Sequence, residues 1–138
     1  MIKVSEVLRD HDDFDGDDKP KSNCAVFGIY DDPQAAVLTY YGLHSQQHRG
    51  QEASGICVSE KISEDKYVFN IQKGHGIALN VFSNKNVLTN VLKGNSAIGH
   101  NRYSTTGASD SRSNIQPFKV NFKEGHLALS HNGNFTNT

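Results

Sequence analysis

Five segments of this chain have the composition and spacing of β-strands, and their number and order most constrain the fold. We predict strands in CAVFGIY, ASGICVSE, YVFNIQKG, SAIGHNRY and HLALSHNG. In the third, Val68, Asn70 and Gln72 alternate with bulky apolar side chains, which is the two-residue period of a half-buried strand. Because the strands cluster instead of alternating strictly with helices, we predict an α+β architecture and not a doubly wound parallel sheet.

Two further segments are predicted to be helical. The first follows a DDP turn, in which Asp32 suits an N-cap and Pro33 the first helical position, and it should end near Gly50. The second covers NVFSNKNVLTNVLKG, as one helix or two short ones ending near Gly94. KISED is interpreted as a turn, and IQPFKVNFKEG is assigned to no strand.

Charge and hydropathy exclude several classes of function. The 138 residues have a formal net charge of −1 and no long run of Lys or Arg, so nothing favours binding to nucleic acid or to a membrane surface. No apolar run approaches the roughly 18 residues of a membrane-spanning helix. MIKVSEVLRDHDD lacks the apolar centre of a secretory signal, so the predicted compartment is the cytoplasm.

Residues 1–23 differ from the rest of the chain. They carry seven acidic and four basic side chains, whereas the residues after them have a slight excess of basic ones. We therefore predict an acidic leader at residues 1–23, which is a candidate propeptide, and one domain at residues 24–138.

The two cysteines, Cys24 and Cys57, are expected to be reduced in a cytosolic protein. Cys57 lies within a predicted strand and is interpreted as a small core residue. Composition alone favours the same interpretation for Cys24, at the boundary between leader and domain. Cleavage before Cys24 would instead give it a free α-amino group, a base that could take the thiol proton and make the sulfur a nucleophile.

The end of the first predicted helix is rich in polar residues. His44 and His48 stand four apart in HSQQH, but the glutamate of an HExxH zinc motif is missing and no third ligand is evident. Ordinary polar histidines are therefore favoured over a metal site. Arg49 and Gly50, in HRGQE, are candidate substrate-binding residues, or they cap and pack the end of the helix.

Two more polar clusters, GHNRYST and SHNGN, end predicted strands. The Asn132 side chain and the backbone N–H of Gly133 could hold a developing oxyanion, although Asn-Gly is also the commonest tight hairpin turn. Arg102 could bind a carboxylate through two parallel hydrogen bonds, with the Thr105 hydroxyl as a further donor.

Taken in order, CAVFGIY, YYGLHSQQHRGQEASGI, KGHGIALNVF, AIGHNRYSTTG, QPF and LALSHNGNFTN resemble the amino-terminal glutaminase domain of amidophosphoribosyltransferases. These are class II glutamine amidotransferases. The resemblance implies a four-layer α-β-β-α sandwich of the amino-terminal-nucleophile hydrolase type, here cut short at the carboxyl end. HRGQE is typical of this branch, whereas domains similar to glucosamine-6-phosphate synthase tend to have HRGYDS.

The resemblance also implies the roles of individual residues. Cys24 would be the catalytic nucleophile, exposed by processing, and would attack the side-chain amide of glutamine. Asn132 and Gly133 would form the oxyanion hole, and Arg102 would bind the α-carboxylate of glutamine with Thr105 nearby. The ammonia would then displace pyrophosphate from phosphoribosyl pyrophosphate in a transferase domain, the first committed step of de novo purine synthesis.

Other expectations concern parts that this sequence does not contain. No cofactor is expected in this segment; the resemblance implies Mg²⁺ for the transferase domain, an iron–sulfur cluster in some members, and a homo-oligomer for the full-length protein. The family's domain continues past HNGN to an aspartate that holds the substrate's α-amino group, and this sequence stops before it. The alternatives are therefore the glutaminase domain of another class II amidotransferase, or an inactive fragment that acts as a non-catalytic module.

Overall fold

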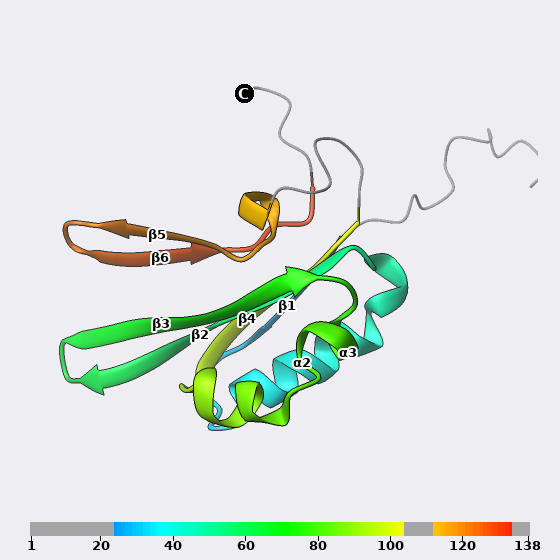
Figure 1. Ribbon diagram of the computed structural model, residues 1–138. Coiled ribbons are helices and arrows are strands. Elements are labelled where there is room, and N and C mark those ends of the chain that lie inside the picture. Colours follow the sequence, from blue (N-terminus) through cyan, green and yellow to red (C-terminus); the bar gives the residue numbers. More distant parts are fainter. Residues whose placement is uncertain (1–23, 104–111, 134–138) are drawn as a thin grey trace, which may run out of the picture.

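The structure is a computed structural model that describes residues 24–103 and 112–133. Its main sheet is antiparallel and four-stranded, in the order β1 (Ala25–Ile29), β4 (Ser96–Arg102), β2 (Ala53–Ser63), β3 (Lys66–His75). A two-stranded hairpin is formed by β5 (Phe118–Phe122) and β6 (Gly125–Leu129). The helices lie on one face of the main sheet and the hairpin on the other (Figure 1), so the described residues supply three of the four expected layers.

The helical segments are shorter than predicted. The first helix, α2 (Ala35–Ser45), begins two residues after Pro33, because Asp32 caps a preceding turn: its Oδ1 accepts the Gln34 N–H at 2.7 Å. After Ser45 the chain continues as a 3₁₀ turn at Gln47–Arg49. The second segment forms two short pieces, α3 (Ala78–Val81) and a π-helical turn at Val87–Val91, as one of the two alternatives predicted. No helix in the described part of the chain is long and apolar enough to cross a membrane.

The core lies between the main sheet and the helices. Alternate residues of the strands supply it, together with apolar residues of α2, of α3 and of the segment that leads from α3 to β4. The buried residues are Ala35, Ala36, Leu43, Ile56, Val58, Ala78, Phe82, Leu92 and Ala97. The helix packs closely on the sheet at Gly42 and Gly99. A Cβ on Gly42 would collide with the Phe27 ring, and a Cβ on Gly99 would lie 2.7 Å from Cγ2 of Thr39.

The opposite face of the sheet carries Arg102, a candidate substrate-binding residue. The strand register places His100 opposite Val26 on β1 and opposite Gly55 on β2, and Gly55 opposite Lys73 on β3. Since side chains alternate along a strand, Arg102 and His100 share this face and Asn101 points to the helices. The two-residue period therefore sorts the GHNRY cluster into a hairpin-facing and a helix-facing set.

The five predicted strands are confirmed, but two assignments between them were wrong. KISED is not a turn as a whole: β2 extends to Ser63 through a bulge, and only the next two residues turn into β3. IQPFKVNFKEG contains β5, which pairs with β6. The outer face of this hairpin is apolar, and its side chains are about half exposed: Val120, Phe122, Leu127 and Leu129.

Candidate active site

Cys24 lies directly before β1, beside the end of β4. The register pairs Ala25 with Asn101, which places Cys24 next to Arg102 across the two strands. The half-buried thiol exchanges two contacts with the backbone of Tyr103: the Tyr103 N–H donates to Sγ at 3.4 Å, and Sγ donates to the Tyr103 carbonyl at 3.7 Å. The candidate nucleophile is thus fixed to the backbone of the residue that directly follows β4.

Arg102 is the last residue of β4 and is only 9% exposed. Its Nε lies 3.9 Å from Oε2 of Glu52, and the Glu52 N–H donates to the Arg102 carbonyl at 3.1 Å. Within the part of the chain that the structure describes, the buried Nη1 of Arg102 has no hydrogen-bond partner. A buried guanidinium normally satisfies its donors, so the donor at Nη1 is left unused, and a carboxylate is the acceptor that suits it best.

The HRGQE segment packs against the same end of β4. Gly50 is buried and extended, and a Cβ added to it would lie 2.8 Å from both the carbonyl carbon of Arg102 and the carbonyl oxygen of Asn101. Gln47 holds the segment from the other side: its Nε2 donates to the Gly50 carbonyl, and its Oε1 accepts the Ala78 N–H at 2.8 Å. Arg49 is exposed in the 3₁₀ turn, so Gly50 is the member of the pair that contacts the end of β4.

Asn132 and Gly133 follow β6 and are exposed. The residue before them, His131, donates its N–H to Oε1 of Gln116 at 2.7 Å. It also lies near His100, whose pKa is affected by both the His131 backbone and the His131 side chain. The candidate oxyanion pair therefore follows a residue that lies near the end of β4, where Arg102 is found. Thr105 lies outside the described residues.

His100 is a member of this region that sequence reasoning missed. It is 1% exposed, and burial lowers its pKa to about 4, although the His131 backbone acts in the opposite direction. The ring is therefore neutral at pH 7. Strand alternation in GHNRY could have shown that His100 shares a face with Arg102. Gln116, which is 7% exposed, carried no such signal, because its contact with His131 depends on where the hairpin lies.

Asn101 has a structural role on the other face. Its Nδ2 donates to the Leu43 carbonyl at 2.7 Å near the end of α2, and its Oδ1 accepts from the Ser54 hydroxyl at 2.9 Å. The helix end and the two central strands are joined at this one residue. The last two residues of β4 thus have different roles: Asn101 joins the helix to the sheet, and Arg102 faces the candidate site.

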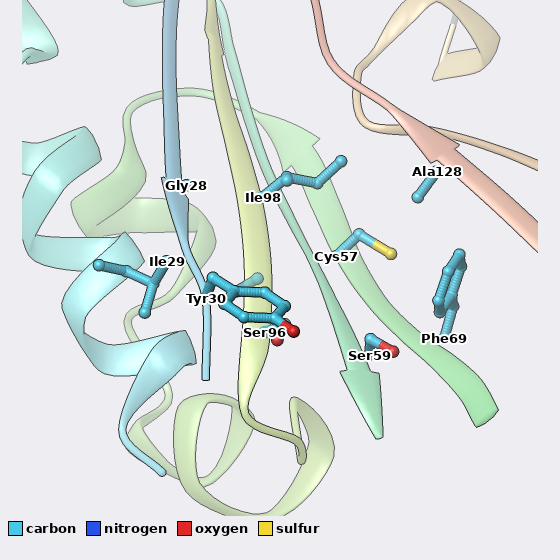
Figure 2. Close-up of a pocket in the computed structure, with 10 residues that line it drawn as sticks. Gly28, Ile29, Tyr30, Cys57, Ser59, Phe69, Ser96, Ile98 and Ala128 are labelled. Carbon is cyan, nitrogen blue, oxygen red and sulfur yellow. The ribbon is translucent and has the colours of Figure 1, made fainter. Parts of the chain in front are cut away.

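The cavity drawn in Figure 2 is separate from these residues. It has a volume of about 360 Å³, lies between the main sheet and β6, and has no charged residue in its wall. Figure 2 shows Cys57 facing Ala128 and Phe69 across this space. Burial raises the pKa of Cys57 to about 11, against the opposing charges of Lys119 and Lys73. Cys57 is therefore a buried, protonated thiol, as predicted, and not a second nucleophile.

The histidine pair of HSQQH is split by the end of α2, since His44 lies in the helix and His48 in the 3₁₀ turn. Among residues 24–103 and 112–133, no three His, Cys, Asp or Glu side chains come together as metal ligands.

Comparison with known proteins identifies relatives over most of the chain. Amidophosphoribosyltransferase 2, chloroplastic, of Arabidopsis thaliana is 44% identical over 140 residues, which cover 99% of this chain and 23% of the relative. Amidophosphoribosyltransferase of Rhizobium etli is 45% identical over 126 residues, or 91% of this chain and 24% of the relative. The chain thus spans about a quarter of the length of these relatives. No family model matches it.

Two solved structures have a similar fold. One, described as the allosteric regulatory enzyme of purine biosynthesis, has a TM-score of 0.63 and 41% identity over 75% of this chain and 21% of its own. The other is the glutamine phosphoribosylpyrophosphate amidotransferase of B. subtilis, with a TM-score of 0.60 and 40% identity over 76% of this chain and 21% of its own. The branch predicted from HRGQE is confirmed by these names. The chain is therefore homologous to the amino-terminal part of the amidophosphoribosyltransferases and has the amino-terminal-nucleophile hydrolase type of fold.

Proposed function

We propose that this chain hydrolyses the side-chain amide of glutamine, with the Cys24 thiol as nucleophile. The observation that carries the proposal is the pairing of β1 with β4, which sets Cys24 beside Arg102. The Nη1 of this buried guanidinium has no partner among residues 24–103 and 112–133. A nucleophile next to a carboxylate-binding group fits an α-amino acid whose side chain reacts. Glutamine is also named for the B. subtilis enzyme of similar fold.

The chemistry begins with proton transfer. A free cysteine has a pKa near 8.5, and an α-amino group near 8, so the amine of an amino-terminal Cys24 is matched to take the thiol proton at neutral pH. Sγ then forms a bond to the amide carbon of glutamine, and the proton passes to the nitrogen as the carbon–nitrogen bond breaks. Ammonia leaves, and water hydrolyses the remaining thioester to glutamate and free thiol.

Negative charge develops on the amide oxygen during the attack. In our proposal the Asn132 side-chain amide and the Gly133 N–H stabilise this oxyanion, and Arg102 binds the substrate's α-carboxylate. Both Asn132 and Gly133 are exposed, which leaves their donors accessible to a substrate. The proposal requires that residues 1–23 be removed, since an amide-bonded Cys24 has no α-amino base.

The wider role follows from the relatives. We propose that the ammonia serves the formation of phosphoribosylamine from phosphoribosyl pyrophosphate, in a transferase region beyond the quarter of the relatives that this chain spans. Mg²⁺ there, an iron–sulfur cluster in some members and a homo-oligomeric full-length enzyme belong to the same proposal. The cytoplasm is the proposed compartment, although several plant relatives are named as chloroplastic.

The test uses protein expressed from its complete reading frame. Intact mass should show a chain that begins at Cys24, glutamate should form from glutamine, and 6-diazo-5-oxo-norleucine should label Cys24. Cys24→Ala should lower glutamine turnover at least about 10³-fold, because the nucleophile is lost. The matched control is Cys57→Ala, which removes the other thiol and should leave turnover within about two-fold.

Turnover that survives Cys24→Ala would exclude the proposed nucleophile. A folded protein that retains Met1, does not label and makes no glutamate would instead support the alternative of a non-catalytic module.

A further inference from the structure

A row of four residues crosses the main sheet beneath the segment that precedes β5. The register aligns Val26, His100, Gly55 and Lys73 on neighbouring strands. Gly55 leaves a gap in this row between two large side chains. A Cβ there would collide with the Gln116 carbonyl oxygen and would lie 3.0 Å from Cδ of Pro117. The backbone at Gln116 therefore rests directly on the sheet, in a notch that only glycine leaves open.

Lys73 fixes this backbone on both sides of Gln116. Its Nζ donates to the Ile115 carbonyl at 2.6 Å and to the Pro117 carbonyl at 3.2 Å. The same ammonium lies 5.9 Å from the centre of the Phe118 ring. Hydrogen bonds from a charged donor are among the stronger ones in proteins, so the segment is held in place along the strand direction as well as above the sheet.

The side chain of Gln116 contacts the segment that follows β6. It is 7% exposed, and its Oε1 accepts the His131 N–H at 2.7 Å. His100, in the same row as Gly55, is buried beside His131. The N–H of His131 is thus held by Gln116, whose backbone rests on the sheet at Gly55, and Asn132 and Gly133 are the next two residues of the chain.

We propose that Gln116 is a positioning residue for the oxyanion hole, seated by Gly55 and Lys73. This inference rests on the proposed glutaminase function. Asn132 and Gly133 are exposed, and donors on an exposed segment stabilise an oxyanion well only if they are already aimed at it. The contact from Gln116 fixes the backbone of His131, and the orientation of the Asn132 and Gly133 donors depends on that backbone because they follow it directly in the chain.

The first test is Gln116→Met, which keeps the size of the side chain and removes the acceptor. We expect kcat for glutamine hydrolysis to fall about 10- to 100-fold with KM little changed, because a displacement of the order of 1 Å can cost about 10² in rate. Gln116→Glu retains an oxygen for the His131 N–H and should recover most of kcat. The matched control is Gln34→Met, at the exposed start of α2, which should match the wild type.

Iodoacetamide separates positioning from general damage. It alkylates a thiol by direct displacement and forms no oxyanion, so the alkylation rate of Cys24 should be the same in Gln116→Met and wild type. If Gln116→Met does not fold, Lys73→Met provides the second test and should give the same fall in kcat, with exposed Lys61→Met as its control.

The inference is overturned if Gln116→Met, or in its place Lys73→Met, keeps kcat within two-fold of the wild type. It is also overturned if folded Gln116→Met and Gln116→Glu lose kcat equally, since the loss would then not follow the acceptor. Failure of the proposed function is a different result: the wild type itself would make no glutamate and Cys24 would not be labelled.

Discussion

Gly50→Ala should destabilise the protein by steric overlap alone. Gly50 has φ of −157° and ψ of 124°, an extended conformation that alanine adopts without strain. The new Cβ would lie 2.8 Å from the Arg102 carbonyl carbon and 2.8 Å from the Asn101 carbonyl oxygen, whereas ordinary contacts begin at 3.4 Å. Relief needs a movement of about 0.6 Å between the HRGQE segment and the end of β4. Both partners are backbone, so no side-chain rotation provides it.

The expected cost follows from this overlap. Overpacking of a close contact typically costs about 1–3 kcal/mol of unfolding free energy. The movement also shifts Arg102 relative to Cys24, and we expect kcat/KM for glutamine to fall about 10-fold, because sub-ångström displacements of binding groups are costly. The unfolding free energy is measured by urea denaturation and kcat/KM by glutamate formation.

Gly28→Ala is the matched control on β1. Its Cβ would lie 3.6 Å from the Ala97 carbonyl oxygen and 3.9 Å from Cγ2 of Ile98, both ordinary contacts. This variant should change the unfolding free energy by less than about 1 kcal/mol in either direction, the strand cost of glycine included. If Gly50→Ala unfolds at the same urea concentration as Gly28→Ala, the close approach to β4 does not exist in solution.

Three further predictions concern buried polar groups. The pKa of His100 is about 4 in the folded protein and 6.5 in the unfolded chain, so the unfolded chain binds the proton more tightly. The free energy of unfolding should therefore fall by on the order of 3 kcal/mol as the pH drops from 7 to 4. His100→Leu should lose this part of the pH dependence in urea titrations, and exposed His75→Leu should keep it. Cys57 should resist iodoacetamide at pH 8, by peptide mapping; rapid alkylation would contradict its raised pKa. Asn101→Leu should lower the unfolding free energy by about 1–3 kcal/mol, because it removes two buried hydrogen bonds, and an unchanged urea midpoint would contradict this.

The strands could be predicted because their signals are local. The alternation around Phe69 gives β3 directly, and β4 follows from the apolar residues of SAIGH. β5 was assigned to no strand although Phe118, Val120 and Phe122 have the same two-residue period, because the preceding Pro117 and the polar residues between them weaken the local signal. The helix start was misplaced because Asp32 caps a turn that precedes the helix, and local composition does not distinguish the two.

The site was harder to predict than the strands. Cys24 and Arg102 are 78 positions apart, and only the pairing of β1 with β4 makes them neighbours. Their roles came from the resemblance, not from the residues themselves. The contact between Gln116 and His131 could not be predicted at all, because it depends on the segment before β5 being seated over a glycine of β2. Close approaches of backbone to backbone leave almost no trace in composition.

The pairing of β1 with β4 also sets the order in which the protein can be assembled on the ribosome. Ala25 emerges long before its partner Asn101, and β4 is the only strand that pairs with β1 in the described part of the chain. Until β4 has been translated, Cys24 has neither Tyr103 nor Arg102 beside it. The surroundings of Cys24 thus form only after β4, the last strand of the main sheet in the described part of the chain, is inserted between β1 and β2.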